Sequence, residues 1–157
     1  MSFPMATTEA CIRFPSASKF WLWVPKLVHV GLLEKSFSQR STVLPEGLTK
    51  LDKNAFRYCP GLMEVTLPST LKTIGDHAFF LCENLREIVI PEGVTSIGER
   101  AFQGCRQMRR AVLPASIKKL SLYVFFECHS KLTIYAPKNS AAHEHAVKRG
   151  YGYVETK

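Results

Sequence analysis

The sequence predicts a solenoid in which short parallel strands stack coil on coil. Proline recurs at a constant interval of 23 residues, and a cysteine, a phenylalanine and an aliphatic residue keep the same interval. Chemically unrelated side chains therefore share one register, which indicates a tandem array. The recurring positions are Pro45, Pro68, Pro91, Pro114 and Pro137; Cys59, Cys82, Cys105 and Cys128; Phe56, Phe79, Phe102 and Phe125; and Leu51, Ile74, Ile97 and Leu120.

A repeat of about 20 to 29 residues with apolar side chains in a fixed frame is typical of a leucine-rich-repeat solenoid. Residues 45–136 hold four such repeats of 23 residues. In the pattern L-x-x-V-x-L-P, as in Leu62, Val65, Leu67 and Pro68, buried positions alternate with outward ones. This alternation predicts a short strand with one buried face. The proline has no N–H to donate and is expected to end the strand.

A turn or a short second strand is expected after each proline, at Ile74–Gly75 and Ile97–Gly98. The A-F-x-x-C stretch comes next, and its spacing fits either one helical turn or a tight loop that faces inward. Phe79 and Phe102 are expected to be fully buried. One coil cannot bury enough apolar surface to fold alone, so each coil needs neighbours and the array needs a cap at both ends.

The C-terminal cap is expected in residues 137–157, as a helix followed by a tail. Asn139 or Ser140 is the expected N-cap, and Gly150 is the expected stop. Inside the helix the sequence places Ala141, Ala142, Ala146 and Val147, and the helix is expected to close the open end of the core.

Residues 1–44 form an N-terminal segment whose first 15 or so residues are expected to be disordered. A degenerate repeat can be threaded through it from about residue 22, with Val28, Leu33, Ser36, Thr42 and Leu44 in repeat positions. The apolar stretch Phe20–Leu33 is interrupted by Pro25 and Lys26 and is too short for a membrane span. It is also a poor signal peptide. Trp21, Trp23, Val28 and Leu32 are instead interpreted as covering the N-terminal end of the core.

The formal net charge is +8, from 21 basic and 13 acidic residues. Such an excess can attract acidic glycans, nucleic acid or an anionic membrane surface. The chain has no recognised nucleic-acid motif, so a solvated basic face is the preferred interpretation and polyanion binding the alternative. The local basic concentration consists of Arg100, Arg106, Arg109, Arg110, Lys118 and Lys119.

No catalytic residue, metal site or cofactor is predicted, and the chain is not expected to be an enzyme. The cysteines lack C-x2-C spacing and are interpreted as a column of buried thiols, with Cys11 outside it. His143 and His145 are two residues apart on the proposed helix and project in different directions. No Ser-His-Asp set or phosphate-binding glycine loop interrupts the period.

The outward residues of the strands form a predicted binding face. One column is largely charged and the other is an apolar stripe that ends in an aromatic residue, and Arg110 and Tyr135 are the expected anchors. The face comprises Glu64, Thr66, Arg86, Glu87, Val89, Arg109, Arg110, Val112 and Tyr135, continued by Ser41, Val43, Met63 and Thr133. An open alternative is that the valines sit there only because strands favour β-branched residues. The loops around Arg57, Phe80 and Gln103 are a second candidate surface.

The units also resemble the BspA-type leucine-rich repeats. The resemblance lies in A-F-x-x-C-x-x-L-x-x-V-x-L-P followed by V-T-S-I-G, as in VTSIGERAFQGCRQMRRAVLP, and in the ending KLTIYAPKNSAAHEHAVKRGY. Members of that family are surface proteins of mucosal bacteria and some protists. The resemblance implies a protein-binding module of adhesin type, with an extracellular matrix or cell-surface protein as partner and no small-molecule substrate. It also implies a cell-surface or secreted location, although without an evident signal peptide an intracellular location stays open.

Overall fold

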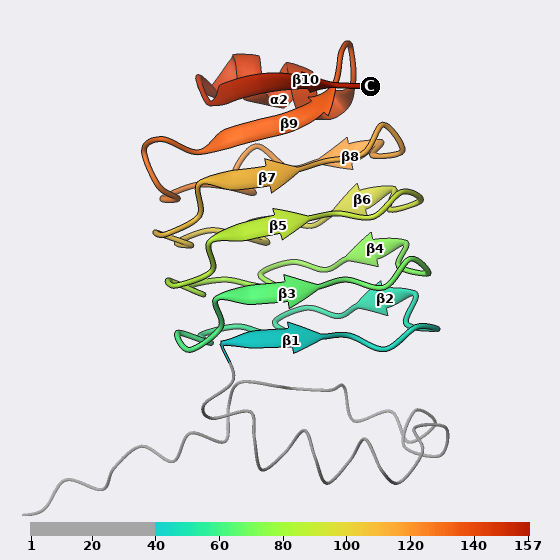
Figure 1. Cartoon of the computed structure of the whole chain (residues 1–157), viewed down its shortest axis with the longest axis vertical. Coiled ribbons are helices and arrows are strands. Elements are labelled where there is room, and N and C mark those ends of the chain that lie inside the picture. The colour runs from blue at the N-terminus through green and yellow to red at the C-terminus, as the bar shows by residue number, and fades with distance from the viewer. Residues whose placement is uncertain (1–39) are drawn as a thin grey trace, which may run out of the picture.

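The computed structural model describes residues 40–157 as a stack of coils with a row of parallel strands along each of two sides (Figure 1). Longer strands line one side, and two-residue strands line the other. The longer strands are β1 (Ser41–Val43), β3 (Glu64–Thr66), β5 (Glu87–Val89), β7 (Arg110–Val112), β9 (Thr133–Pro137) and β10 (Gly152–Thr156). The short strands are β2 (Lys50–Leu51), β4 (Thr73–Ile74), β6 (Ser96–Ile97) and β8 (Lys119–Leu120).

All strand pairs are parallel, and within the repeats each residue faces its equivalent one coil further on. Glu87 pairs with Arg110, and Arg110 pairs with Thr133. The short strands keep the same frame, from Leu51 through Ile74 and Ile97 to Leu120. The predicted solenoid of stacked parallel strands is confirmed.

The core is built from columns of identical side chains. The rings of Phe56, Phe79, Phe102 and Phe125 stack with centroids 5.1, 5.1 and 5.5 Å apart. As predicted, Phe79 and Phe102 are fully buried, at 0% exposure. The column runs through the stack and joins all four coils.

The A-F-x-x-C stretches are tight loops and not helical turns. In the first three coils a left-handed residue opens the loop, with φ of 63° at Asn54 and 54° at both His77 and Arg100. Backbone N–H groups inside the loops donate to the next coil, as Phe79 N–H does to the Ala101 carbonyl at 2.7 Å. The period of the array is thus maintained by bonds between coils and not by bonds within one helix.

The cap helix α2 (Ala141–Arg149) begins after Ser140, whose hydroxyl accepts a bond from His143 N–H, and it stops at Gly150 with φ of 70°. Ala142 and Ala146 are buried, whereas Val147, which also lies inside the helix, is 67% exposed. His145 takes the inward place because the helix is rotated so that its face of residues 142, 145 and 146 covers the last coil.

The tail contains a strand that the sequence did not predict. β10 pairs with β9 over five residues, from Gly152–Thr133 to Thr156–Pro137. β9 therefore includes Pro137 as its last residue and does not stop before it, unlike the strands that precede Pro68, Pro91 and Pro114. α2 and β10 together form one shorter, irregular coil at this end of the stack.

At the other end, β1 pairs with β3, so the strand of the proposed degenerate repeat is in frame, with Thr42 opposite Val65. Leu44 is buried. The remaining predictions for the N-terminal segment, including those for Cys11, Trp21, Trp23, Val28 and Leu33, fall outside the described residues. Within residues 40–157 no helix has the length and apolarity needed to cross a membrane.

Candidate binding face

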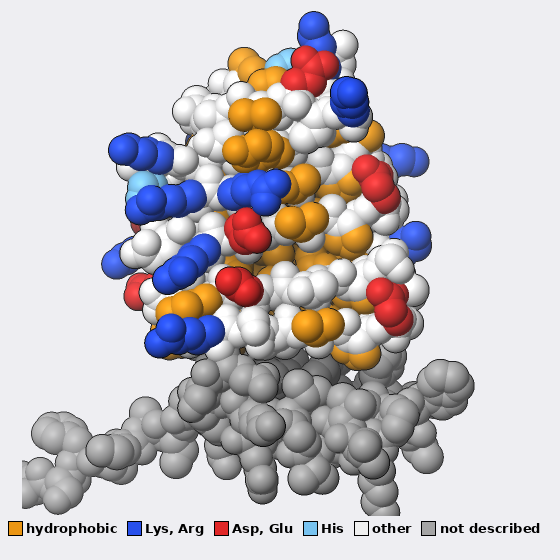
Figure 2. Space-filling model, viewed as in Figure 1, with side chains coloured by type: hydrophobic (Ala, Val, Ile, Leu, Met, Phe, Trp, Pro, Cys, Tyr) orange, Lys and Arg blue, Asp and Glu red, His pale blue; other side chains and the backbone are white. Residues whose placement is uncertain are grey.

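The long strands carry two outward columns side by side. The charged column runs Ser41, Glu64, Glu87, Arg110 and Thr133; the apolar column runs Val43, Thr66, Val89, Val112 and Tyr135. Val43 and Val89 are 68% and 48% exposed. In the space-filling view, apolar side chains form a band along this face, with basic and acidic side chains beside it (Figure 2).

β10 adds a residue to the apolar column that sequence reasoning missed. Val154 lies opposite Tyr135 and is 43% exposed. The run Tyr151 to Thr156, with its β-branched and aromatic residues after the helix stop at Gly150, is the signal that could have identified this strand. The apolar column therefore ends at Val154.

The two expected anchors contact each other. The Arg110 guanidinium lies 5.0 Å from the centroid of the Tyr135 ring, and its Nη1 donates to Glu87 Oε2 at 3.3 Å. The Arg110 and Glu87 side chains are each 49% exposed, so their ion pair adds little stability. Its main effect is to hold the guanidinium over the aromatic ring in a fixed direction.

A third column of exposed side chains borders the charged one. Arg86 and Arg109 stand at equivalent places one coil apart, since Arg109 N–H donates to the Arg86 carbonyl at 2.9 Å. Met63 precedes them and is half-buried, and exposed Arg40 begins the series. The sheet face thus has a basic border, a mixed charged column and an apolar column.

The six basic residues proposed for polyanion binding are not brought together. Arg110 belongs to β7, Lys119 to β8 in the opposite sheet, and Arg100 to a loop. Arg100 and Arg106 also lie near carboxylates, at 3.5 Å from Glu99 and 3.8 Å from Glu83. The repeats contain 12 basic residues, but these residues are spread over different sides of the stack and need not form one basic surface.

The loops around Arg57, Phe80 and Gln103, which were the second candidate surface, carry aromatic rings and arginines. The Arg57 guanidinium lies 4.7 Å from the Tyr58 ring centroid and 5.2 Å from that of Phe80. Burial and the nearby cations, Arg57 first among them, lower the pKa of His77. This second candidate surface therefore combines aromatic rings with an arginine guanidinium.

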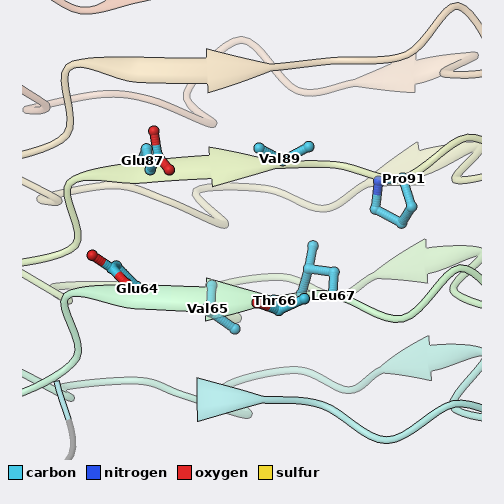
Figure 3. A pocket seen from close by; sticks show the side chains of 7 residues that line it. All are labelled: Glu64, Val65, Thr66, Leu67, Glu87, Val89 and Pro91. Atoms are coloured by element: carbon cyan, nitrogen blue, oxygen red, sulfur yellow. The ribbon is translucent and has the colours of Figure 1, made fainter. Parts of the chain in front are cut away.

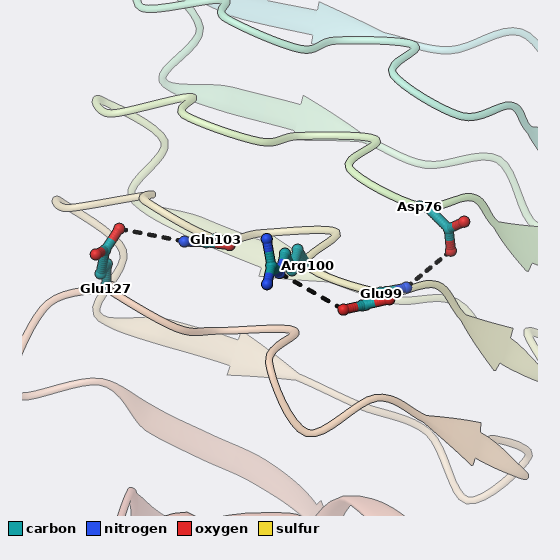
Figure 4. Close-up of polar contacts among 5 residues, drawn as sticks. All are labelled: Asp76, Glu99, Arg100, Gln103 and Glu127. Atoms are coloured by element: carbon teal, nitrogen blue, oxygen red, sulfur yellow. Dashed lines mark hydrogen bonds and ion pairs between the residues drawn. The ribbon is translucent and has the colours of Figure 1, made fainter.

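Polar contacts between coils hold these loops in place, as shown in Figure 4. Gln103 Nε2 donates to Glu127 Oε2 at 3.3 Å, and Glu99 N–H donates to Asp76 Oδ1 at 2.9 Å. Arg100 lies between these two contacts in the close-up.

The nucleophilic and metal-ligating side chains are dispersed or buried. In the part of the chain that the structure describes, no three His, Cys, Asp or Glu residues gather as a metal site would require. Burial raises the pKa of the Cys105 thiol, which opposes formation of the reactive thiolate. His145 is enclosed by the cap, where burial lowers its pKa to about 4.

A hollow interrupts the sheet face between β3 and β5 (Figure 3). Its volume is about 280 Å³, and it opens on the same side as the two columns. The lining residues are Glu64, Val65, Thr66, Leu67, Glu87, Val89 and Pro91.

The chain is similar to leucine-rich-repeat proteins of known structure from bacteria. A leucine-rich repeat protein from Bacteroides ovatus is 27% identical, with a TM-score of 0.63 over 74% of this chain and 30% of its own. A leucine-rich repeat protein from T. pallidum is 26% identical, with a TM-score of 0.53 over 62% of this chain and 59% of its own. A leucine-rich cell surface protein from Faecalibacterium prausnitzii is 24% identical, with a TM-score of 0.56 over 73% of this chain and 36% of its own.

This chain therefore spans less than two thirds of each of these relatives. Comparison with curated protein sequences finds no significant match. The sequence profile of the BspA type leucine-rich repeat region matches residues 31–147 in six copies. That match covers well over half of the chain and the same repeats that form the stacked coils, so the chain belongs to the BspA-type leucine-rich-repeat family.

Proposed function

We propose that the sheet face binds another protein, with Arg110 and Tyr135 as its anchors. The observation that carries this proposal is the contact between these two side chains beside an exposed apolar column. Arginine and tyrosine are enriched among the residues that dominate binding energy at protein interfaces. The fold is consistent with a protein-interaction module, because leucine-rich-repeat proteins are typically binding modules without enzymatic activity.

The partner that fits the family is a matrix or cell-surface protein, which would make this chain part of an adhesin. The similar protein from Faecalibacterium prausnitzii is described as a cell surface protein. Short strands joined by bonds between coils give a rigid surface, so little conformational entropy is lost when a partner binds. The basic border at Arg86 and Arg109 would orient the partner, and the apolar column would supply the buried contact.

Pull-down from matrix and cell-surface extracts tests the proposal. The double variant Arg110→Ala, Tyr135→Ala should lose most of the captured protein, with unchanged folding. A matched control is Arg100→Ala, Tyr123→Ala, which removes another arginine and tyrosine whose guanidinium-to-ring distance is 5.9 Å. Capture that persists in the first variant and disappears in the control would redirect the search to the loops around Arg57, Phe80 and Gln103.

Salt concentration distinguishes this function from polyanion binding. Capture through aromatic and aliphatic anchors should change little when salt is raised, whereas binding to acidic glycan, nucleic acid or an anionic membrane weakens steeply. The net charge of +8 is the observation that favours the polyanion alternative. Capture that is lost between about 50 and 200 mM salt would support it.

A further inference from the structure

The hollow lies where the ladder of the long strands is interrupted. β1 pairs with β3, and β5 pairs with β7, but in the described residues no strand pairing joins β3 to β5. At the other steps a residue just after one strand donates its N–H to the next coil: Leu44 to Thr66 at 3.0 Å, Ile90 to Val112 at 2.9 Å, and Leu113 to Tyr135 at 2.8 Å. The equivalent bond from Leu67 to the Val89 carbonyl is not formed. These two backbone groups border the hollow.

The hollow is acidic at one end and apolar at the other. Glu64 and Glu87 stand at the first positions of their strands, and Leu67 and Pro91 follow the last positions. A strand rises about 3.3 Å per residue, so the two ends lie about 10 Å apart. Figure 3 shows the carboxylates at one end and the side chains of Leu67 and Pro91 at the other.

The acidic end has room for another cation. Among residues 40–157 none forms an ion pair with Glu64, and Glu87 contacts one cation, Arg110, on the side away from Glu64. Because Glu64 has no ion pair among the described residues and Glu87 has one, this end of the hollow keeps a net negative charge. An anionic group placed there would be repelled by the carboxylates. A purely apolar group would displace water from a carboxylate without replacing the lost hydrogen bonds.

We propose that this hollow receives a lysine or arginine side chain of the protein partner, an inference that rests on the proposed function. A basic side chain has an apolar stem and a charged head, which matches the two ends of the hollow. Its stem packs against Val89, Leu67 and Pro91, and its head lies between the carboxylates of Glu64 and Glu87. The backbone of the partner meets the apolar column, where the free Val89 carbonyl can accept one of its N–H groups.

Nuclear magnetic resonance with the isotope-labelled full chain tests the inference without the partner. Titration with the tripeptides Gly-Arg-Gly and Gly-Lys-Gly should shift the amide signals of Thr66 and Val89, and Gly-Glu-Gly should not. In Glu64→Gln, Glu87→Gln the affinity should fall about threefold to fivefold, as expected for exposed charges. The control Glu83→Gln, Glu99→Gln removes two exposed carboxylates that pair with other arginines and should bind like the parent chain.

Arg110→Ala separates this inference from the proposed function. Loss of the competing guanidinium should strengthen tripeptide binding, whereas capture of the protein partner should weaken. Equal shifts with Gly-Glu-Gly, an unchanged affinity in the Glu64 and Glu87 double variant, or no shift at Thr66 and Val89 would each overturn the inference. Since both glutamates are exposed, the amide spectrum of each variant should show an intact fold, and the single variant Glu64→Gln provides a second measurement.

Discussion

At the scale of single residues, the cysteine column gives each coil a polar contact inside the apolar core. Cys82 Sγ donates to the Phe56 carbonyl at 3.0 Å, and Cys105 Sγ donates to the Phe79 carbonyl at 3.3 Å. A thiol is small enough for the core and weakly polar enough to satisfy a carbonyl there. The column therefore links neighbouring coils through S–H groups, and Cys82, Cys105 and Cys128 are free thiols.

Thiol labelling should follow this burial. Cys82 and Cys105, both at 0% exposure, should react slowly with an alkylating reagent until the chain is denatured, and half-buried Cys128 should react sooner. Mass spectrometry of the alkylated, unreduced protein would locate the label on each peptide. A bridged peptide between two cysteines of the column would contradict the interpretation.

His145 should make the stability of the chain depend on pH. Burial, followed by the charges of Arg149 and Lys148, lowers its pKa from 6.5 to about 4, so the folded state favours the neutral imidazole. In the unfolded chain His145 becomes protonated as the pH falls below about 6.5. In the folded chain it becomes protonated only near pH 4. The stabilisation is therefore complete above pH 6.5 and is lost as the pH falls towards 4, by about 3 kcal/mol in all.

Denaturation of the parent chain and of His145→Phe at pH 7 and at pH 5 would measure this effect. The Phe125 and Tyr151 rings, with centroids 6.2 and 5.8 Å from that of His145, give the replacement an apolar surrounding. The parent should lose more stability than the variant over this interval. An equal loss in both would assign the pH dependence to other groups.

At the scale of elements, glycine follows the short strands β4 and β6, where a side chain would meet the backbone of the preceding coil. A methyl group on Gly98 would lie 2.5 Å from Asp76 N and 2.6 Å from the Gly75 carbonyl carbon. Both contacts are with backbone of the preceding coil, which cannot move without disturbing β4 and β6. The Ile-Gly dipeptides of the sequence thus set the spacing of the second sheet.

Gly98→Ala should destabilise the chain by about 1–3 kcal/mol, the usual range for overpacking. Gly61→Ala is the matched control, since a methyl group there meets nothing within 4 Å. The control should stay within about 0.5 kcal/mol of the parent. Chemical denaturation of the three chains gives the comparison, and similar values for both variants would remove the steric explanation.

At the scale of the whole molecule, stability depends on contacts between neighbouring coils. Phe102 stacks on Phe79 in one direction and on Phe125 in the other, so its ring belongs to two interfaces at once. In a repeat array each unit contacts only its neighbours, and loss of an interior contact weakens both sides.

Phe102→Ala should therefore lower the free energy of unfolding by about 3–5 kcal/mol. Chemical denaturation followed by circular dichroism would measure the loss. Phe126→Ala is a useful control, because that ring belongs to the same loop type but is exposed. A loss below about 1 kcal/mol for Phe102→Ala would reject the assignment of this column to the core.

The repeat frame, and through it the fold, can be predicted from the amino-acid sequence alone. A period of 23 places Phe79 in the core and Glu64 and Thr66 outside it, because the strand alternation and the parallel register are both local consequences of the repeat. The ends of the helix α2 were also predictable, since Ser140 and Gly150 satisfy its free backbone groups.

Features that depend on how neighbouring coils pack cannot be predicted from the repeat and are seen only in the folded chain. β10 and Val154 lie beyond the last repeat, where no period indicates a strand, and they form because β9 offers an unpaired edge. The burial of His145 in place of Val147 follows from the rotation of α2 over the last coil. The break between β3 and β5 reflects small differences in how two coils with the same repeat pattern stack, and the pattern carries no information about them.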